Sequence, residues 1–338
     1  MTAGEEIRFA VVGSPVGQSL SPLLALLTAA HLRRSGAAVS MTSATWVETD
    51  RIEAAMSWAM SGSGPEISPN RVKGRLEPLL EAAEQVVEEA VEAPSSWGAK
   101  PGGMILGGAV GPGVYSDSAV WLSVTSPLKH QLGPRSGIDC VDDGLLLAAM
   151  NQLVWSAGRW SGASTDGYGV VRIGCVFGLF VSGAPPPVLV VRGGGASARA
   201  SVAAWAEAGG LVEPVLGRRM LDRRGPWAGS ILDDAAAMRS MGPRMTIDFD
   251  AAPASEVRPD AAFSRPATIH LAATYRHGGS GSPDQSMDGS KTLDGRWLLA
   301  AQHLEAWARL IRPDLIESLP DLALTVARLR AMESMVAR

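Results

Sequence analysis

Apolar positions along the chain alternate between short β-branched runs and longer segments with helical spacing, as in α/β proteins. Residues 7–12 form an apolar run that predicts the first strand, and a polar loop follows at 13–21. A helix is expected next, with Ser21 as its N-cap, Pro22 at its first position and Gly36 at its end. Ligands of such sheets bind beyond the carboxyl ends of the strands, where this loop would lie.

A strand–turn–helix–strand unit is predicted in the second half. Residues 188–191 are a buried strand, and Arg192-Gly-Gly-Gly-Ala196-Ser-Ala follows it. Residues 197–209 suit a helix and 211–216 suit the next strand. Glycines in such a turn let the backbone approach a pyrophosphate, and the helix N-terminus favours its charge. The pattern therefore predicts a dinucleotide-binding unit.

The region from about 50 to 120 is interpreted as an insertion into the first domain. Residues 76–90 have helical spacing with a glutamate-rich outer face, and a Gly/Pro-rich stretch follows at 98–113. A surface elaboration, a dimer contact and a lid over the substrate are all compatible with this pattern. Further along, 283–290 are expected to form a loop and 319–337 a terminal helix.

Composition narrows the class of protein. A length of 338 residues favours two domains, and a net charge of −4 gives no basic footprint for nucleic acid. Two distant cysteines fit a reducing cytoplasm, and no apolar run reaches the roughly 18 residues of a membrane span. The five histidines have no metal-ligand spacing. We therefore expect a cytoplasmic, metal-free monomer or homodimer that binds a small molecule, with no membrane or nucleic-acid partner.

Lys129 is the first candidate for chemistry. Only four of the 30 cationic side chains are lysines, namely Lys73, Lys100, Lys129 and Lys291. Arginine cannot give up its proton in a protein, whereas lysine can act as an acid or base. An aspartate, Asp166, stands in a second block, Gly162-Ala-Ser-Thr-Asp166-Gly-Tyr-Gly169. Together the two side chains could pass a proton to and from a hydroxyl or ketone.

Four blocks, in order, resemble the shikimate dehydrogenase and quinate dehydrogenase family. The loop 13–22 resembles its Ser-x-Ser-Pro segment, and 124–129 resembles its Val-Thr-x-Pro-x-Lys segment. Asn151 with 165–169 resembles its Asn and Thr-Asp-Gly-x-Gly segments, and 294–307 resembles its C-terminal segment with a buried glutamine. The family uses a nicotinamide dinucleotide to interconvert a ring ketone and a ring hydroxyl, and the resemblance implies the same here.

The resemblance also assigns site residues. Lys129 and Asp166 would be catalytic, and the substrate would be bound by Ser19, Ser21, Thr125, Asn151, Tyr275 and Gln302. The two serines would hold a carboxylate, and a polyhydroxylated ring needs several fixed polar partners. For Ser21 the alternative is a helix cap, and for Asn151 it is a buried residue that shapes its loop.

The cofactor half departs from the family pattern. Gly193, Gly194, Gly195 and Ala196 would form the dinucleotide turn, but Arg192 stands at the position of its first glycine and could crowd the adenosine side. Gly193 could shift the turn and compensate. Arg218 and Arg219 follow the next strand, with no carboxylate in that stretch of sequence, which favours a 2′-phosphate and hence NADP. Ala272 replaces an aspartate three residues before Tyr275.

The sequence thus predicts a two-domain α/β protein, with an N-terminal α/β substrate domain and a Rossmann-like dinucleotide-binding domain. The substrate domain spans 1–166, with the insertion at about 50–120, and is completed by 297–338; the dinucleotide domain spans 167–296. The favoured function is NADPH-dependent reduction of 3-dehydroshikimate to shikimate. Quinate or an amino analogue could be the substrate instead. A non-catalytic protein that binds a shikimate-like ligand is the alternative that the Arg192 and Ala272 departures motivate.

Overall fold

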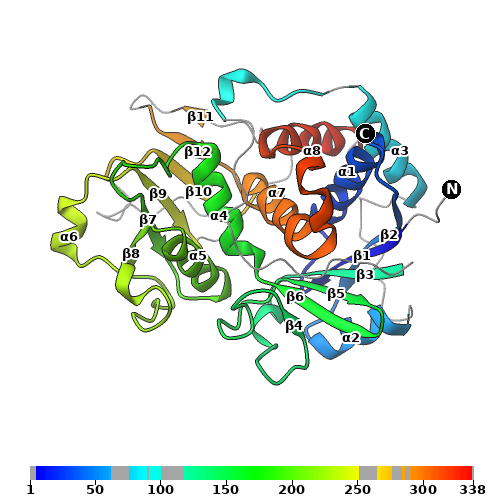
Figure 1. The fold of residues 1–338 in the computed structure, drawn as a ribbon, viewed down its shortest axis with the longest axis horizontal. Coiled ribbons are helices and arrows are strands. Elements are labelled where there is room, and N and C mark those ends of the chain that lie inside the picture. Colours follow the sequence, from blue (N-terminus) through cyan, green and yellow to red (C-terminus); the bar gives the residue numbers. More distant parts are fainter. Residues whose placement is uncertain are drawn as a thin grey trace. The chain divides into compact units, whose positions relative to one another are not determined.

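The computed structural model describes residues 5–61, 76–89, 91–99, 118–250, 265–275, 284–285 and 289–336. The chain divides into two compact units (Figure 1). The first unit comprises Met1–Ala93, Gly107–Thr165 and His303–Arg338, and the second comprises Pro94–Leu106 and Asp166–Gln302. Each unit contains its own six-stranded sheet.

The sheet of the first unit has the strand order β2-β1-β3-β5-β6-β4. Its strands are β1 (Glu5–Gly13), β2 (Val39–Glu48), β3 (Ser118–Val124), β4 (Asp139–Cys140), β5 (Gln152–Ser156) and β6 (Arg159–Ala163). Strand β1 is parallel to β2 and β3, whereas β5 is antiparallel to β3 and β6. The carboxyl ends of β1 and β3 and the amino end of β5 therefore share one edge of the sheet.

Helices cover both faces of this sheet. Alternate residues of β1 point to opposite faces: Ala10 and Val12 pack in a cluster with Trp58 of α2 (Ile52–Ser61). Phe9 packs on the other face against Trp121, which contacts Trp307 edge to face. Helices α1 (Ser21–Arg34), α3 (Leu76–Glu88) and α8 (Leu322–Val336) contact one another beside β2 (Figure 1).

The second unit has a largely parallel sheet of order β11-β12-β10-β9-β7-β8. Its strands are β7 (Val188–Arg192), β8 (Leu211–Val215), β9 (Arg244–Asp248), β10 (Ile269–Ala272), β11 (Asp284–Gln285) and β12 (Lys291–Leu293), and only β11 runs antiparallel to its neighbour. Its helices are α4 (Thr165–Val176), α5 (Ala196–Glu207), α6 (Asp234–Arg239) and α7 (Gly295–Ala306), with the first residue of α4 and the last residues of α7 in the first unit. Helix α5 packs against β7 and β8. The two-domain α/β prediction is confirmed.

Short helical turns complete the fold. They are Ser95–Trp97, Leu128–His130, Ala228–Ser230 and Pro313–Ser318, and a π-helical turn at Trp307–Ile311 extends α7. The loop expected at 283–290 contains β11, and most of the Gly/Pro-rich stretch at 98–113 lies outside the described residues.

Part of the predicted insertion packs as its spacing indicates. Helix α3 buries Leu79, Ala83, Val86 and Val87. Beyond it, the buried Trp97 belongs to the second unit, where its ring lies 5.4 Å from that of Trp297 and its carbonyl accepts a 3.0 Å hydrogen bond from Lys291 Nζ. The insertion therefore contributes to both units.

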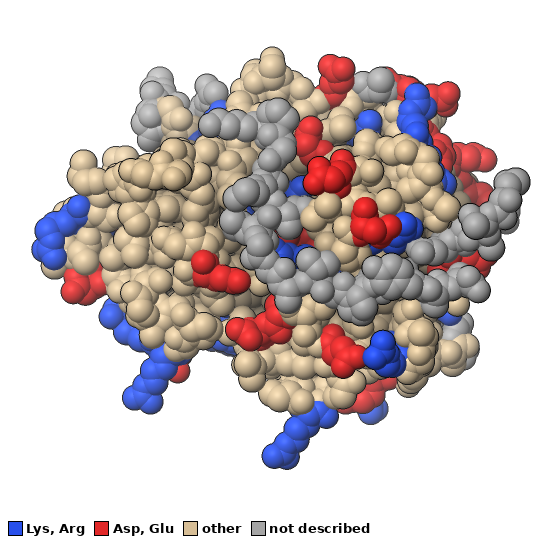
Figure 2. Space-filling view, viewed as in Figure 1, with Lys and Arg blue, Asp and Glu red and all other residues tan. Residues whose placement is uncertain are grey.

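No helix among the described residues is long and apolar enough to cross a membrane. The described part of the face in Figure 2 carries acidic and basic side chains interspersed among a majority of other residues.

Candidate active site

Two loops of the first unit lie together at the carboxyl edge of its sheet. Thr125 N donates to Val12 O at 2.9 Å, and Ser14 N donates to Ser126 O at 2.9 Å. Their approach requires Gly13, where φ is +153° and a Cβ would come within 2.5 Å of Thr125 Cγ2. The loop that carries Ser19 therefore adjoins the loop that carries Thr125 and Lys129.

The two predicted carboxylate-binding serines differ in exposure. Ser21 is the first residue of α1 and is buried, whereas Ser19 is partly exposed and its Oγ accepts the Ser21 amide at 3.3 Å. The prediction that Ser21 is the N-cap was wrong: Leu20 occupies that position, and its side chain cannot cap. Trp46 Nε1 fixes the loop by donating to the Ser19 carbonyl at 3.0 Å. Ser19 is thus the better placed of the two to meet a ligand.

Lys129 lies in the short turn Leu128–His130 after β3. Leu128 is fully buried and anchors this turn, and its amide donates to Thr125 O at 2.9 Å. Lys129 and Thr125 are partly exposed, and His130 is exposed. The turn therefore holds Lys129 beside Thr125 at the edge where the Ser19 loop lies.

Asn151 is buried and bonds to the start of α4. Its Oδ1 accepts the Thr165 amide at 2.6 Å, and its Nδ2 donates to Thr165 Oγ1 at 3.1 Å. The neighbouring Gln152, which stands where the resembling family usually has threonine, accepts a 2.7 Å hydrogen bond from Trp121 Nε1. Both ends of the Asn151 amide position Thr165, and so the backbone that leads directly into Asp166.

Sequence reasoning missed a partly buried carboxylate that supports the same segment. Asp142 accepts the Ser164 amide at 2.7 Å and the Gly144 amide at 2.8 Å. Burial raises the pKa of Asp142, and these two backbone bonds oppose the rise. Burial, together with the Asp142 charge, raises the pKa of the Cys140 thiol to about 11, so this thiol stays protonated at neutral pH. The signal available in sequence was the Asp142-Asp143-Gly144 turn.

Asp166, in the second unit, is buried against the dinucleotide turn. Its Oδ2 accepts a 2.7 Å hydrogen bond from Ser197 Oγ, and Ser197 lies in the first turn of α5. The two helices approach closely because a Cβ on Gly167 would come within 2.1 Å of Ala200 O. A helix N-terminus favours a nearby negative charge. The predicted catalytic carboxylate is therefore next to the predicted cofactor turn.

Two other predicted substrate residues lie in the second unit. Gln302 of α7 packs against Gly169 of α4, where a Cβ would come within 3.2 Å of Gln302 Cγ. Tyr275 follows β10, and the Arg296 guanidinium lies 5.6 Å from its ring centre. Arg296 is itself paired with Asp294 at 2.6 Å.

The glycine turn between β7 and α5 has the shape expected for close approach of a ligand. Gly193 has φ of +108°, and Gly195 is the N-cap of α5 with no side-chain cap. A Cβ on Gly194 would come within 2.2 Å of Met220 O. At the helix start itself, a Cβ on Gly195 would meet nothing within 4 Å, and such an open helix N-terminus suits a phosphate.

Arg192 precedes the turn, and its Cγ would lie 3.0 Å from a Cβ on Gly217, so the expectation that it crowds the adenosine side stays a prediction. Arg192 is the last residue of β7, and its guanidinium pairs with Asp248 of β9 at 2.7 Å, with both side chains largely buried. Asp248 is also in register with Ala272 of β10. An acid is therefore present on the strand beside Ala272, and Gly193 takes the positive φ of the turn.

Three arginines lie near the glycine turn. Arg218 and Arg219 are exposed after β8, and Arg199, in the first turn of α5, donates to Gly194 O at 2.9 Å. Burial lowers the pKa of Arg199, and the nearby charge of Arg219 lowers it further. An anion bound there would relieve this repulsion. Arg199 was missed in sequence because its relation to Arg219 depends on how α5 packs.

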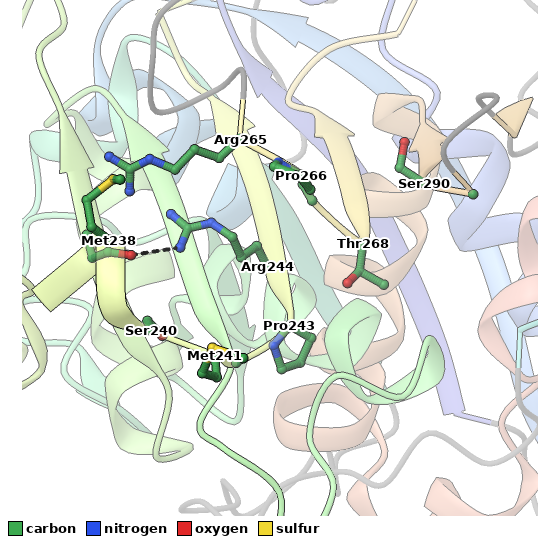
Figure 3. A pocket seen from close by; sticks show the side chains of 13 residues that line it. Met238, Ser240, Met241, Pro243, Arg244, Arg265, Pro266, Thr268 and Ser290 are labelled. Atoms are coloured by element: carbon green, nitrogen blue, oxygen red, sulfur yellow. Dashed lines mark hydrogen bonds between the residues drawn. The ribbon is translucent and has the colours of Figure 1, made fainter.

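A hollow at the opposite edge of the second sheet does not belong to this arrangement. Its volume is about 550 Å³, and it lies at the amino ends of β9 and β10 (Figure 3). Arg244 and Arg265 line it, and both pair with Glu213. Among the described residues, no cluster of His, Cys, Asp and Glu could hold a metal ion.

The two sheets and the glycine turn define a two-domain α/β protein whose second unit has a Rossmann-like fold. More specifically, the chain has the fold of shikimate dehydrogenases, which confirms the resemblance at the level of fold. The shikimate 5-dehydrogenase of Thermus thermophilus, solved with NADP(H) and shikimate, matches with a TM-score of 0.55 at 19% identity, over 96% of this chain and 99% of that one. The Aquifex aeolicus shikimate dehydrogenase matches with a TM-score of 0.51 at 15% identity, over 98% and 99%.

A longer protein also matches. The S. pombe dehydroquinate dehydratase and shikimate dehydrogenase structure has a TM-score of 0.55 at 16% identity, over 97% of this chain and 53% of that one. No protein-family model matches the chain, and no curated protein matches it in sequence.

Proposed function

We propose that this protein is an oxidoreductase that reduces 3-dehydroshikimate to shikimate with NADPH. The hydrogen bond from Ser197 to Asp166 carries the proposal, because it joins the carboxylate of the Thr-Asp-Gly-x-Gly block to the first turn of the helix after the glycine turn. The fold neighbours that hold shikimate and NADP(H) support it.

The residues at the glycine turn fit a dinucleotide. Gly195, the N-cap of α5, has nothing within 4 Å of where a Cβ would lie, and the helix N-terminus favours a pyrophosphate. Arg218 and Arg219 would bind a 2′-phosphate, aided by Arg199. When bound, NADPH supplies the hydride that reduces the ketone.

The chain's own residues would bind the ring and move the proton. Ser19, assisted by the start of α1, binds the ring carboxylate, and Thr125, Asn151 and Gln302 bind ring hydroxyls. As the ketone carbon accepts hydride, the carbon–oxygen π bond breaks and Lys129 gives a proton to the oxygen. Asp166, oriented by Ser197, is its acid–base partner. Each polar partner left unpaired by a wrong ring would reduce turnover.

The test follows NADPH consumption by absorbance with 3-dehydroshikimate, 3-dehydroquinate and no substrate. Consumption with 3-dehydroshikimate above the no-substrate rate supports the proposal. Faster consumption with 3-dehydroquinate would assign the protein to quinate. A protein that binds shikimate in calorimetry but never takes up NADPH would be the non-catalytic ligand-binding alternative.

A further inference from the structure

An aspartate of the chain itself lies against the glycine turn. Asp250 comes two residues after β9, and its amide is held by Asp248 Oδ1 at 2.9 Å. Its carboxylate reaches past the end of β7 to the end of β8, where Oδ2 accepts the backbone amide of Arg218. Residues 216–221, directly after β8, contain no acid, so the carboxylate reaches this position only through the fold.

The carboxylate occupies space that the glycines leave open. A Cβ on Gly217 would come within 2.3 Å of Asp250 Oδ2, and one on Gly193 would come within 3.2 Å of Oδ1. Both glycines lie at the carboxyl ends of adjacent parallel strands, where ligands of such sheets bind. Asp250 therefore lies where the adenosine end of a dinucleotide would approach.

The charge of Asp250 is only weakly compensated. Arg218 Nε is 3.9 Å from its Oδ1, and the Arg218 side chain is 77% exposed, whereas that of Asp250 is 15% exposed. Asp248 differs, because it pairs with Arg192 at 2.7 Å between two largely buried side chains. The Arg218 guanidinium also donates to the Asp250 carbonyl at 3.0 Å. Asp250 therefore accepts hydrogen bonds from both the amide and the guanidinium of Arg218.

We propose that Asp250 is a resident anion that determines how tightly the 2′-phosphate of the cofactor binds. Backbone amides and cations at such a turn suit a phosphate, and here the Asp250 carboxylate already accepts the Arg218 amide while the Asp250 carbonyl accepts its guanidinium. A 2′-phosphate must displace the carboxylate and meets a like charge, whereas a cofactor with a free 2′-hydroxyl does not. This inference rests on the proposed use of NADPH, and it identifies Asp250 as the residue that weakens binding of the 2′-phosphate.

The test is calorimetric titration of NADPH and NADH into the wild type, Asp250→Asn and Asp222→Asn. Asn keeps an acceptor for the Arg218 amide but removes the charge. Asp222 is an exposed acid of the same unit that accepts the Arg224 amide at 2.9 Å, so it controls for net charge. Asp250→Asn should bind NADPH about tenfold more tightly, the scale of one charge-assisted contact, and NADH within about threefold of wild type. Asp222→Asn should leave the affinities for NADPH and NADH unchanged. In the double variant Arg218→Ala/Asp250→Asn, the gain in NADPH affinity should be lost.

The outcomes separate the two proposals. Unchanged or weaker NADPH binding by Asp250→Asn, or equal tightening of both cofactors, overturns the role of Asp250 while leaving the oxidoreductase intact. If neither cofactor binds to the wild type or to Asp250→Asn, both proposals fail. Thermal unfolding checks that the variants fold, and Asp250→Ser repeats the titration if Asn disturbs the turn.

Discussion

The residue with the clearest chemical assignment is Lys129. We expect Lys129→Met to lower turnover by about 10²–10⁴-fold, the range for removal of a general acid, while cofactor affinity stays nearly unchanged. Lys129→Arg should be almost as damaging, because arginine keeps the charge but cannot release its proton. Steady-state kinetics and NADPH titration measure the two effects. His130→Gln, in the same turn but exposed, is the control, and activity of Lys129→Met within about threefold of wild type would refute the assignment.

A second residue, His303, should govern how stability depends on pH. Its ring is buried, with its centre 5.8 Å from the ring centre of Phe9 and 5.3 Å from that of Trp121. Among the described residues, neither ring nitrogen has a hydrogen-bond partner. Burial lowers the pKa of His303 to about 3. The unfolded chain takes up a proton near pH 6.5, whereas the folded protein does not until about pH 3. The contribution of the neutral His303 ring to the free energy of unfolding is therefore fully present above pH 6.5 and is lost as the pH falls toward 3.

The effect of His303 can be isolated by substitution. Each pH unit within that window costs up to about 1.4 kcal/mol, so the step from pH 6.5 to 5 costs about 2 kcal/mol. His303→Leu should remove that part of the pH dependence, measured by urea unfolding at pH 7 and pH 5. His130→Gln should retain it. The same loss of stability at pH 5 in His303→Leu and wild type would contradict the role of the buried ring.

At the residue scale, sequence predicts those positions whose role is fixed by a local block. Lys129, Asp166 and the glycines of 193–195 could be proposed because the required residue types stand at fixed spacing, and their roles stay predictions. Arg199, Asp248 and Asp250 could not, because their roles depend on which strands are neighbours. The pairing of Arg192 with Asp248 follows from the register of β7 and β9, and no pattern within either segment encodes it.

At the scale of elements, periodicity predicted α3, β7, α5 and β8 to within a few residues. Apolar spacing is sufficient there because α3 buries one face, whereas β7 is a continuous apolar run that is buried throughout. The start of α1 was predicted incorrectly because a serine before a proline is also compatible with a first helical turn that begins at the serine. Strand β11 was taken for loop because two residues paired at a sheet edge leave no period to detect.

The crossing of α4 and α5 supplies a prediction at this scale. Gly167→Ala places a methyl group 2.1 Å from Ala200 O and 2.9 Å from Ala204 Cβ, so the helices must separate. Overpacking of this kind costs about 1–3 kcal/mol, which we expect in urea unfolding. Activity should fall as well, because the Asp166–Ser197 bond depends on the same approach. Gly229→Ala, with nothing within 4 Å of its Cβ, is the control. Unchanged stability of Gly167→Ala would show that the crossing adjusts easily.

For the whole molecule, the division into units distributes the predicted residues unevenly. Ser19, Ser21, Thr125, Lys129 and Asn151 belong to the first unit, whereas Asp166, Tyr275, Gln302 and all the predicted cofactor residues belong to the second. Sequence predicted the second unit to begin at 167 and end at 296. The compact units of the structure meet in the chain at Thr165–Asp166 and at Gln302–His303, within helices α4 and α7. Helical periodicity continues across both points, so it contains no signal for either one.

This division predicts separate ligand footprints. NADPH should slow amide exchange chiefly at the start of α5 and after β8, around 193–199 and 217–219. Shikimate should slow it around 14–20 and 125–130, because those loops hold the residues proposed to bind the ring. Hydrogen–deuterium exchange measured by mass spectrometry tests this, with each ligand at about 100 times its Kd, where binding stabilises the folded state by about 2.7 kcal/mol. The π-helical turn at Trp307–Ile311 lies in neither footprint and is the internal control. Protection of 14–20 by NADPH alone, with none from shikimate, would contradict the assignment of the ring to the first unit.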